Sequence, residues 1–261
     1  MTTWTRKLYE HNFLAISQGA SYGYLPIYKF GYNPDINGEE ETVWSHGGIY
    51  TYLTSAVPLY VSSSSISDTL GGTGVNSIRI FGLDANYNQV SEDITLTGQT
   101  QKVTQNSYIR VSRMYATLAG SSGTAAGTIY LARLGAVAGV PTGAVSATID
   151  LGSNQTLMAV YTVPAGYTLY LDDINFTTAV SQGNSYMNVR FIARDFGSNV
   201  FRDQVKIVMQ SNTYIDKFQY PQKYAEKTDI EARALSFGSS NNPISATWQG
   251  VLVDNTHQKE R

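Results

Sequence analysis

The feature that most constrains this chain is a succession of short segments in which apolar or β-branched residues alternate with polar ones. Clusters of Gly, Ser, Asn and Asp separate these segments. Alternation predicts β-strands, because successive side chains of a strand point to opposite faces. No stretch has the sustained i, i+3, i+4, i+7 apolar spacing of an amphipathic helix. The expected strands are Tyr50–Leu53, Pro58–Ser62, Ser77–Leu83, Gln89–Leu96, Tyr108–Leu118, Thr128–Leu134, Leu157–Val163, Tyr167–Thr178, Tyr186–Phe196, Val200–Met209, Tyr214–Tyr220, Asp229–Ser236 and Ile244–Val253.

Short strands joined by turns, without helices between them, indicate antiparallel sandwiches rather than a parallel α/β sheet. A run of small residues with Gly and Pro, residues 134–147, interrupts the series and marks a domain boundary. The sequence therefore predicts an all-β fold with two antiparallel β-sandwich, jelly-roll-like domains behind an extended N-terminal arm. The expected limits are 1–45 for the arm, 46–136 for the first domain, 137–147 for the linker and 148–261 for the second, jelly-roll-like domain.

The expected arm is rich in aromatic residues, which are scattered among Gly, Pro and Asn without a helical or alternating period. Such a segment cannot form a core of its own, so its rings must be buried on the parent domain or on another molecule. Both alternatives are open, and the sequence hypothesis favours a neighbouring subunit or partner. The residues expected to make these contacts are Tyr9, Phe13, Tyr22, Tyr24, Tyr28, Phe30, Tyr32 and Trp44.

The amino-acid composition excludes several classes of functional site and partner. The chain has no cysteine, which excludes disulfides, zinc thiolates, iron–sulfur clusters and thiol nucleophiles. Its 18 Lys and Arg against 20 Asp and Glu leave no basic footprint for nucleic acid. Only 15% of the residues are charged, which is typical of β-proteins that bury much of their outside against neighbours. The sequence shows neither a signal peptide nor an apolar run long enough to span a membrane, so no membrane partner is expected.

Two acidic segments are candidate cation sites. The segment 84–88 begins like a calcium loop, but the later ligand positions do not follow the pattern, so a hairpin turn held by Asx hydrogen bonds is favoured. The segment 35–41 contains three adjacent glutamates, which are typical of a solvated loop or a contact with a basic partner. We expect no bound metal and no cofactor.

The search for catalytic groups finds no convincing constellation. His11, His46 and His257 are not spaced as metal ligands, and the segment 120–123 only superficially resembles a nucleophile elbow. Adjacent carboxylates at 172 and 173 would point to opposite faces of a strand and make a poor acid/base pair. Gly71–Gly74 and Ser62–Ser65 lack the lysine and following helix of a phosphate-binding loop. The sequence predicts that the protein is not an enzyme, with no catalytic residue assigned.

Several segments resemble structural proteins of the virions of short-tailed, particularly marine, bacteriophages, and the likeness extends over most of the chain. The resemblance depends more on the order and spacing of these segments than on any single segment. They are residues 29–37 with 41–44, then 82–88, 156–166, 226–233 and 251–255. The resemblance implies a virion component, made and assembled in the host cytoplasm, and it assigns no catalytic or binding residue.

The favoured function is a capsid decoration (cement) protein that forms homo-oligomers, with a trimer preferred, and stabilises a shell of major capsid protein. One alternative is a tail or fibre component that contacts the host surface. Another is a polysaccharide-binding lectin or glycan-active enzyme, which would need a groove with clustered aromatic and acidic residues. The first two require the same kind of stable β-module, so the sequence does not separate them.

Overall fold

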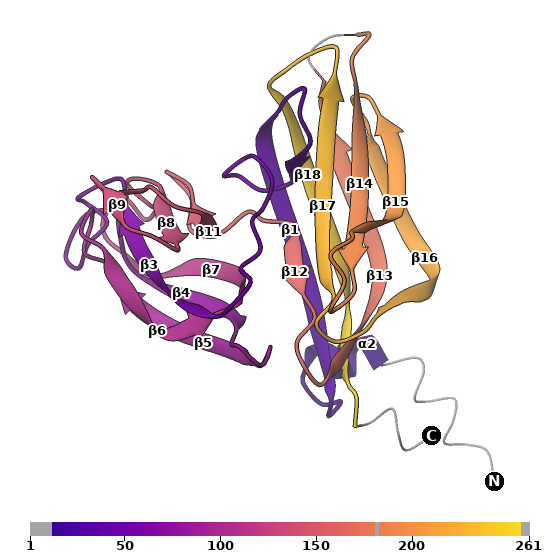
Figure 1. Ribbon diagram of the computed structural model, residues 1–261, viewed down its shortest axis with the longest axis horizontal. Helices are drawn as coiled ribbons and strands as arrows, with labels where there is room; N and C mark the ends of the chain where they lie inside the picture. Colours follow the sequence, from indigo (N-terminus) through magenta and orange to yellow (C-terminus); the bar gives the residue numbers. More distant parts are fainter. Residues whose placement is uncertain (1–11, 181–182, 257–261) are drawn as a thin grey trace.

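The computed structural model describes residues 12–180 and 183–256. It is nearly all β, with 58% strand and 2% helix, which confirms the predicted fold class. Within the described residues the helical content is one short element, α2 (Asn12–Ser17). Helices long and apolar enough to cross a membrane are absent from the described part of the chain. The strands gather into two lobes that lie side by side (Figure 1).

The larger lobe is a sandwich of two antiparallel sheets, one of four strands and one of five. One sheet has the order β1–β18–β13–β16, with strands β1 (Tyr24–Ile36), β18 (Asn242–Asp254), β13 (Tyr167–Thr178) and β16 (Thr213–Tyr224). The other has the order β12–β17–β14–β15, with strands β12 (Val160–Thr162), β17 (Asp229–Phe237), β14 (Tyr186–Arg194) and β15 (Arg202–Met209), and short β2 (Glu41–Thr42) beside β17. Trp248, Phe176 and Phe191 are fully buried between the sheets.

The pairing of these strands is nested. The outermost pair is β1 with β18, the next is β12 with β17, then β13 with β16, and the innermost pair is β14 with β15. A long hairpin rolled into two sheets in this way is a jelly roll. We call this lobe the jelly roll, and its strand order bears out the jelly-roll prediction for the second half of the chain.

The smaller lobe, which we call the first lobe, lies between β2 and β12 in the sequence and is therefore inserted after the first strands of the jelly roll. One of its sheets has the order β11–β8–β3–β6, with strands β11 (Val145–Ile149), β8 (Ile129–Ala132), β3 (Val57–Ser63) and β6 (Lys102–Tyr108). The other has the order β5–β4–β7, with strands β5 (Gln89–Thr95), β4 (Val75–Leu83) and β7 (Arg110–Ala119). Strands β9 (Ala136–Val137) and β10 (Val140–Pro141) form a small hairpin.

The chain crosses between the lobes twice, and both crossings are buried. At the first, Val43 packs in the jelly-roll core and Trp44 packs in the core of the first lobe. At the second, alternate side chains serve the two cores: Met158 and Val160 face the first lobe, whereas Ala159 and Tyr161 face the jelly roll. This alternation follows from the period of two of an extended segment. The two cores therefore share a wall around β12.

The expectation that residues 1–45 form an extended arm without an alternating pattern is wrong for β1. Its residues pair with β18 from Tyr24↔Val253 to Ile36↔Asn242, so most of the expected arm is the first strand of the jelly roll. The missed signal is that the aromatic residues occupy even positions, which is the alternation of a strand. The expected limits 1–45 and 148–261 divide this jelly roll, because they separate β1 from β18.

The expected linker also differs from the structure. β11 begins inside residues 137–147 and pairs with β8, and its Ala147 and Ile149 lie in the core of the first lobe. The chain enters the jelly roll only after Met158. Whether each lobe folds independently stays a prediction.

Candidate functional site at the junction of the lobes

The junction of the two lobes is built around a buried ion pair. Arg110 on β7 donates from Nε and Nη2 to the two carboxylate oxygens of Asp229 on β17, at 2.8 and 3.0 Å. Its remaining guanidinium nitrogen, Nη1, donates to the backbone carbonyls of Leu53 and Ile109. Both side chains are under 10% exposed. A buried carboxylate and guanidinium are tolerated only when each is paired and hydrogen-bonded, as they are here.

Asp229 accepts two further hydrogen bonds. Arg194 on β14 donates to Oδ2 at 2.5 Å, and the Thr162 hydroxyl donates to Oδ1 at 2.6 Å. Two arginines therefore share one carboxylate, which leaves the centre of the junction with excess positive charge. Strands β7, β12, β14 and β17, from both lobes, each supply one of these groups.

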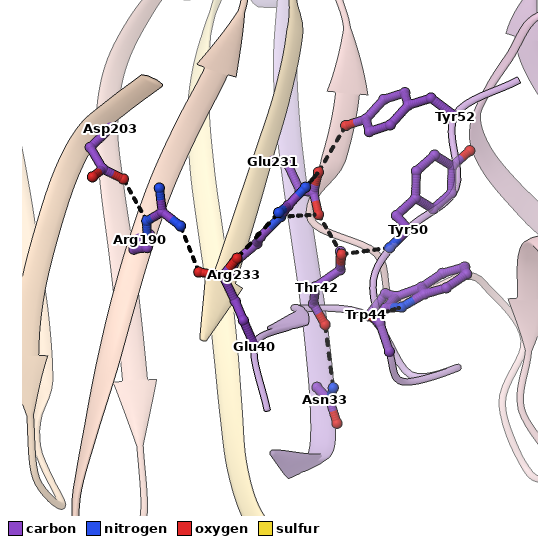
Figure 2. Close-up of polar contacts among 11 residues, drawn as sticks. Asn33, Glu40, Thr42, Trp44, Tyr50, Tyr52, Arg190, Asp203, Glu231 and Arg233 are labelled. Carbon is purple, nitrogen blue, oxygen red and sulfur yellow. Dashed lines mark hydrogen bonds and ion pairs between the residues drawn. The ribbon is translucent and has the colours of Figure 1, made fainter. Parts of the chain in front are cut away.

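A second polar chain runs from the outside of the jelly roll to the first crossing (Figure 2). Arg190 contacts Glu40 and Asp203, and Arg233 contacts Glu40 and Glu231. Burial opposes ionisation of Glu40, but the hydrogen bonds from Arg190 and Arg233 outweigh it and hold the pKa of this carboxyl below its ordinary value.

The inner end of this series of polar contacts holds the backbone of the first crossing in place. Fully buried Glu231 accepts hydrogen bonds from the hydroxyls of Thr42 and Tyr52, and the Thr42 hydroxyl oxygen accepts the backbone N–H of Tyr50. Burial, together with the charge of Glu231, raises the pKa of Tyr52 well above its usual value. The segment 50–53, expected as a strand, lies outside the strands but contributes both tyrosines to the junction.

Cations and aromatic rings alternate across the junction in one continuous series, which we call the cation–ring ladder. Its order is Arg233, Phe201, Arg194, Tyr52, Arg110, Tyr87, Lys227 and Phe196. Each cation lies 4.6–5.6 Å from the centroid of the next ring. Cations at this distance are attracted to the negative face of a ring. The ladder joins Tyr52, Arg110 and Tyr87 of the first lobe to the jelly roll.

Two members of the ladder have a strained backbone. Tyr87 and Lys227 have φ values of 66° and 63°, in the left-handed region that is costly for residues other than glycine. Tyr87 lies in the turn between β4 and β5, where the Asp84 carboxylate accepts the backbone N–H groups of Asn86 and Asn88. This is the hairpin turn with Asx hydrogen bonds that the sequence predicts. The Tyr87 ring in this turn lies 5.6 Å from the Lys227 ammonium group.

Two cavities open at the junction. The first, about 260 Å³, is lined by the ladder residues Tyr52, Tyr87, Arg110, Arg194, Phe196 and Lys227, with Leu53, Thr54, Asp195, Gly197, Ser198 and Asp229. The second, about 340 Å³, lies between β1, β4 and β7 and contains Lys29. Lys29 is 8% exposed and donates to the backbone carbonyl of Ser112 on β7. Burial, with a smaller contribution from Arg113, lowers the pKa of Lys29 to about 7.

The acidic segment 35–41, expected as a solvated loop or a contact with a basic partner, is exposed at Asp35 and Glu39 but turns Glu40 and Glu41 inward. Glu40 pairs with Arg190 and Arg233, and buried Glu41 accepts the backbone N–H of Gly48 at 2.8 Å. Among the described residues, no group of three or more His, Asp or Glu side chains is placed to hold a metal ion.

The other residues considered for chemistry do not come together. His11 and His257 lie outside the described residues, and His46 packs against the rings of Trp44 and Tyr130. Burial, rather than an ion pair, lowers the pKa of His46. Asp172 and Asp173 stay adjacent on β13, where burial and then the charge of Asp173 raise the pKa of Asp172.

The aromatic residues expected to contact a partner are not gathered in one place. Trp44 is 3% exposed in the core of the first lobe, and Tyr24, Tyr28, Phe30 and Tyr32 lie along β1. Tyr28 and Tyr32 are 56% and 36% exposed, and Tyr22 is 82% exposed. Tyr9 and the Phe13 side chain lie outside the described part. A role of these residues in contacts with other molecules stays a prediction.

Comparison with known proteins gives only distant similarities. No family model matches the chain, and no curated protein matches it. Among solved structures, T=1 particles derived from infectious bursal virus align over 89% of this chain and 70% of theirs, with 10% identity and a TM-score of 0.26. The VP2 subviral particle of infectious bursal disease virus aligns over 89% and 72%, with 10% identity and a TM-score of 0.22. At such low scores the likeness assigns neither a family nor a function.

Proposed function

We propose that the chain is a structural component of a virus particle and, more specifically, a capsid decoration protein that binds the outside of a shell of major capsid protein. The sequence resemblance to virion proteins of short-tailed bacteriophages supports this proposal. A jelly roll with an inserted lobe agrees with it, because jelly rolls occur in viral capsid and lectin domains. That agreement is an analogy at the level of the fold, so the surface must carry the argument.

The carrying observation is a set of exposed apolar side chains on or beside the strands at which the two sheets of the jelly roll end. β15 and β16 are the last strands of their sheets and follow each other in the chain. Val200, Val208, Ile215 and Tyr220, on or beside these strands, are 56%, 68%, 71% and 75% exposed. We call these four residues the edge residues. Open strand edges with exposed apolar side chains promote association, so a chain with these residues is suited to assembly.

Two kinds of contact follow from this geometry. Edge strand β16 suits pairing between copies of this chain in a homo-oligomer, with a trimer preferred, and the exposed rings Tyr28 and Tyr32 at the opposite edge suit the major capsid protein. Low charge favours both, because charged residues are depleted at the centres of interfaces. Both edges belong to the same hydrogen-bonded sheet, β1–β18–β13–β16, which keeps the two surfaces in a fixed relation to each other.

The copy number in purified particles tests the function. A decoration protein is expected in amounts comparable with the major capsid protein, measured by gel densitometry of the particles. A copy number far below that of the shell protein contradicts decoration and favours a tail or fibre component. Absence of the chain from the particles contradicts any virion role.

A matched pair of variants tests the role of the edge residues. Ile215→Lys is expected to reduce self-association and binding to particles that lack the chain, measured by sedimentation. Ile66→Lys in the first lobe is the control, because Ile66 is 72% exposed and Ile215 is 71% exposed. Equal effects of the two variants would show that general surface apolarity, rather than the edge residues, drives association.

A further inference from the structure

The 260 Å³ cavity at the junction has more positive than negative groups in its wall. Arg110, Arg194 and Lys227 line it, and Asp229 is the carboxylate that both arginines share. Asp195 also lines the cavity, but it forms an ion pair with Arg202, which lies outside the wall. The wall of the cavity therefore has three cations, and in the described part of the chain Asp229 is the one carboxylate that pairs with any of them.

Lys227 is the cation that this arrangement leaves without an acidic partner. Within residues 12–180 and 183–256, its ammonium group has no hydrogen bond or ion pair. Its Nζ instead lies 5.6 Å from the centroid of the Tyr87 ring and 4.8 Å from that of Phe196. An ammonium group held between two rings at a cavity wall keeps its donors free for an anion.

The strained residues point to the same place. In the described part of the chain, four residues other than glycine have a positive φ, and two of them, Tyr87 and Lys227, line this cavity from opposite lobes. Left-handed backbone at residues of this size costs on the order of 1 kcal/mol each and is retained where the surroundings or a function require it. Here it aims a ring and an ammonium group into one cavity.

The remaining wall suits a ligand that has hydroxyl groups and an apolar face. The Phe196 ring is 60% exposed at the cavity, and the hydroxyls of Tyr87 and Thr54 have no hydrogen bond among the described residues. Sites for small organic ligands combine aromatic walls with a few convergent polar groups in this way. A bare inorganic anion would leave the ring and these hydroxyls unused.

We infer that this cavity binds the carboxylate of an acidic sugar, with Lys227 at the carboxylate and Phe196 against the sugar ring. The inference does not depend on the proposed role in a virus particle. Because the wall comes from both lobes, a bound acidic sugar bridges them. Arg and Lys pair with carboxylates through charge-assisted hydrogen bonds, which are about twice as strong as neutral ones.

Isothermal titration of the full chain with sodium glucuronate tests the inference. Saturable binding is expected that weakens with added salt, with no binding of glucose and weaker binding of acetate. Lys227→Gln is expected to weaken glucuronate binding about tenfold or more. Lys206→Gln, which removes the same charge from exposed β15, is the control and is expected to bind like the wild type.

A second variant separates the sugar contact from the charge. Phe196→Ala removes an exposed ring, so the fold is expected to persist, and glucuronate binding is expected to weaken while acetate binding is unchanged. Lack of saturable glucuronate binding by the wild type overturns the inference. Wild-type affinity in Lys227→Gln also overturns it, as does acetate binding as tightly as glucuronate.

Discussion

Arg110 and Asp229 lie 119 positions apart in the sequence, yet they form a two-pronged ion pair in which both side chains are almost fully buried. One belongs to the inserted lobe and the other to the jelly roll. The pair ties the lobes together at the point where the cation–ring ladder passes between them.

Arg110→Met is expected to destabilise the protein by about 3 kcal/mol. The buried Asp229 carboxylate would lose its two hydrogen bonds from Arg110 and keep only those from Arg194 and Thr162. Chemical denaturation followed by circular dichroism measures the change. Arg79→Met is the control, because Arg79 forms a similar two-pronged pair with Asp93 at the surface, where both side chains are 42–52% exposed. Little change is expected there. Equal losses in the two variants would contradict a special role of the buried pair.

Stability is expected to increase with pH above about 7 because of Lys29. Its pKa is about 7 in the folded protein and 10.5 for an ordinary lysine, so between these values the unfolded chain holds a proton that the folded chain has lost. The free energy of unfolding should then rise by about 1.4 kcal/mol per pH unit. Above pH 10 the gain should reverse, since burial raises the pKa of Tyr50 and Tyr161 in the folded state.

Lys29→Met is expected to remove this pH dependence between pH 7 and 9.5 and to be more stable than the wild type at pH 6. Denaturation curves of the two proteins across this range provide the measurement. Parallel curves for both proteins would show that Lys29 is solvated and titrates normally.

Gly31→Ala is expected to destabilise the fold by about 1–3 kcal/mol or more. Gly31 lies on β1 where the crossings pass, and a Cβ there would approach the backbone nitrogen of Ala159 at 2.3 Å and the carbonyl oxygen of Val43 at 2.4 Å. Gly38→Ala, with no atom within 4 Å of the added Cβ, is the control. Thermal unfolding distinguishes them, and an unchanged midpoint for Gly31→Ala would mean that β1 is not seated against the crossings.

Deletion of residues 1–40 is expected to abolish cooperative folding of the jelly roll, because it removes β1 and leaves β18 as an uncovered edge. Deletion of residues 1–11 alone is expected to leave the fold intact. Far-ultraviolet circular dichroism and calorimetry of the two truncations provide the measurement. A fully folded 1–40 deletion would restore the hypothesis of a dispensable arm.

Proteolytic cleavage within residues 134–143, where Leu134 and Val137 are 58% and 72% exposed, is expected to leave the two fragments associated. β11 would stay paired with β8, and Met158 and Val160 would stay in the first-lobe core. Size-exclusion chromatography of the cleaved protein tests this. Separation into two compact species would instead support a domain boundary at 137–147.

Strands with clear alternation could be predicted closely from the sequence. β13 agrees with its expected limits at both ends, and β4 and β5 agree to within two residues. β6 was missed apart from Tyr108, because residues 102–107 are polar except for Val103, whereas β7 agrees with the expected strand 108–118 to within two residues. β1 was missed because Gly and Pro between its rings obscured the period of two.

The candidate site could not be predicted, for a physical reason. Its partners come from strands far apart in the chain, and neither Arg110 nor Asp229 belongs to a local motif. The signals at Tyr87 and Lys227 are backbone angles, which a sequence does not display. A pattern of residues reports on near neighbours along a strand, whereas the junction depends on how two lobes are docked.

The nested pairing also sets an order for synthesis on the ribosome. β1 is made before its partner β18, and the whole inserted lobe is translated between them. The inserted lobe can therefore complete its sheets while β1 still lacks its partner, and the jelly roll closes only after β18 has been made. Contacts of such long sequence separation form slowly. A chain that terminates early cannot close the outermost strand pair, so incomplete copies would be marked by an open sheet before they reach an assembly.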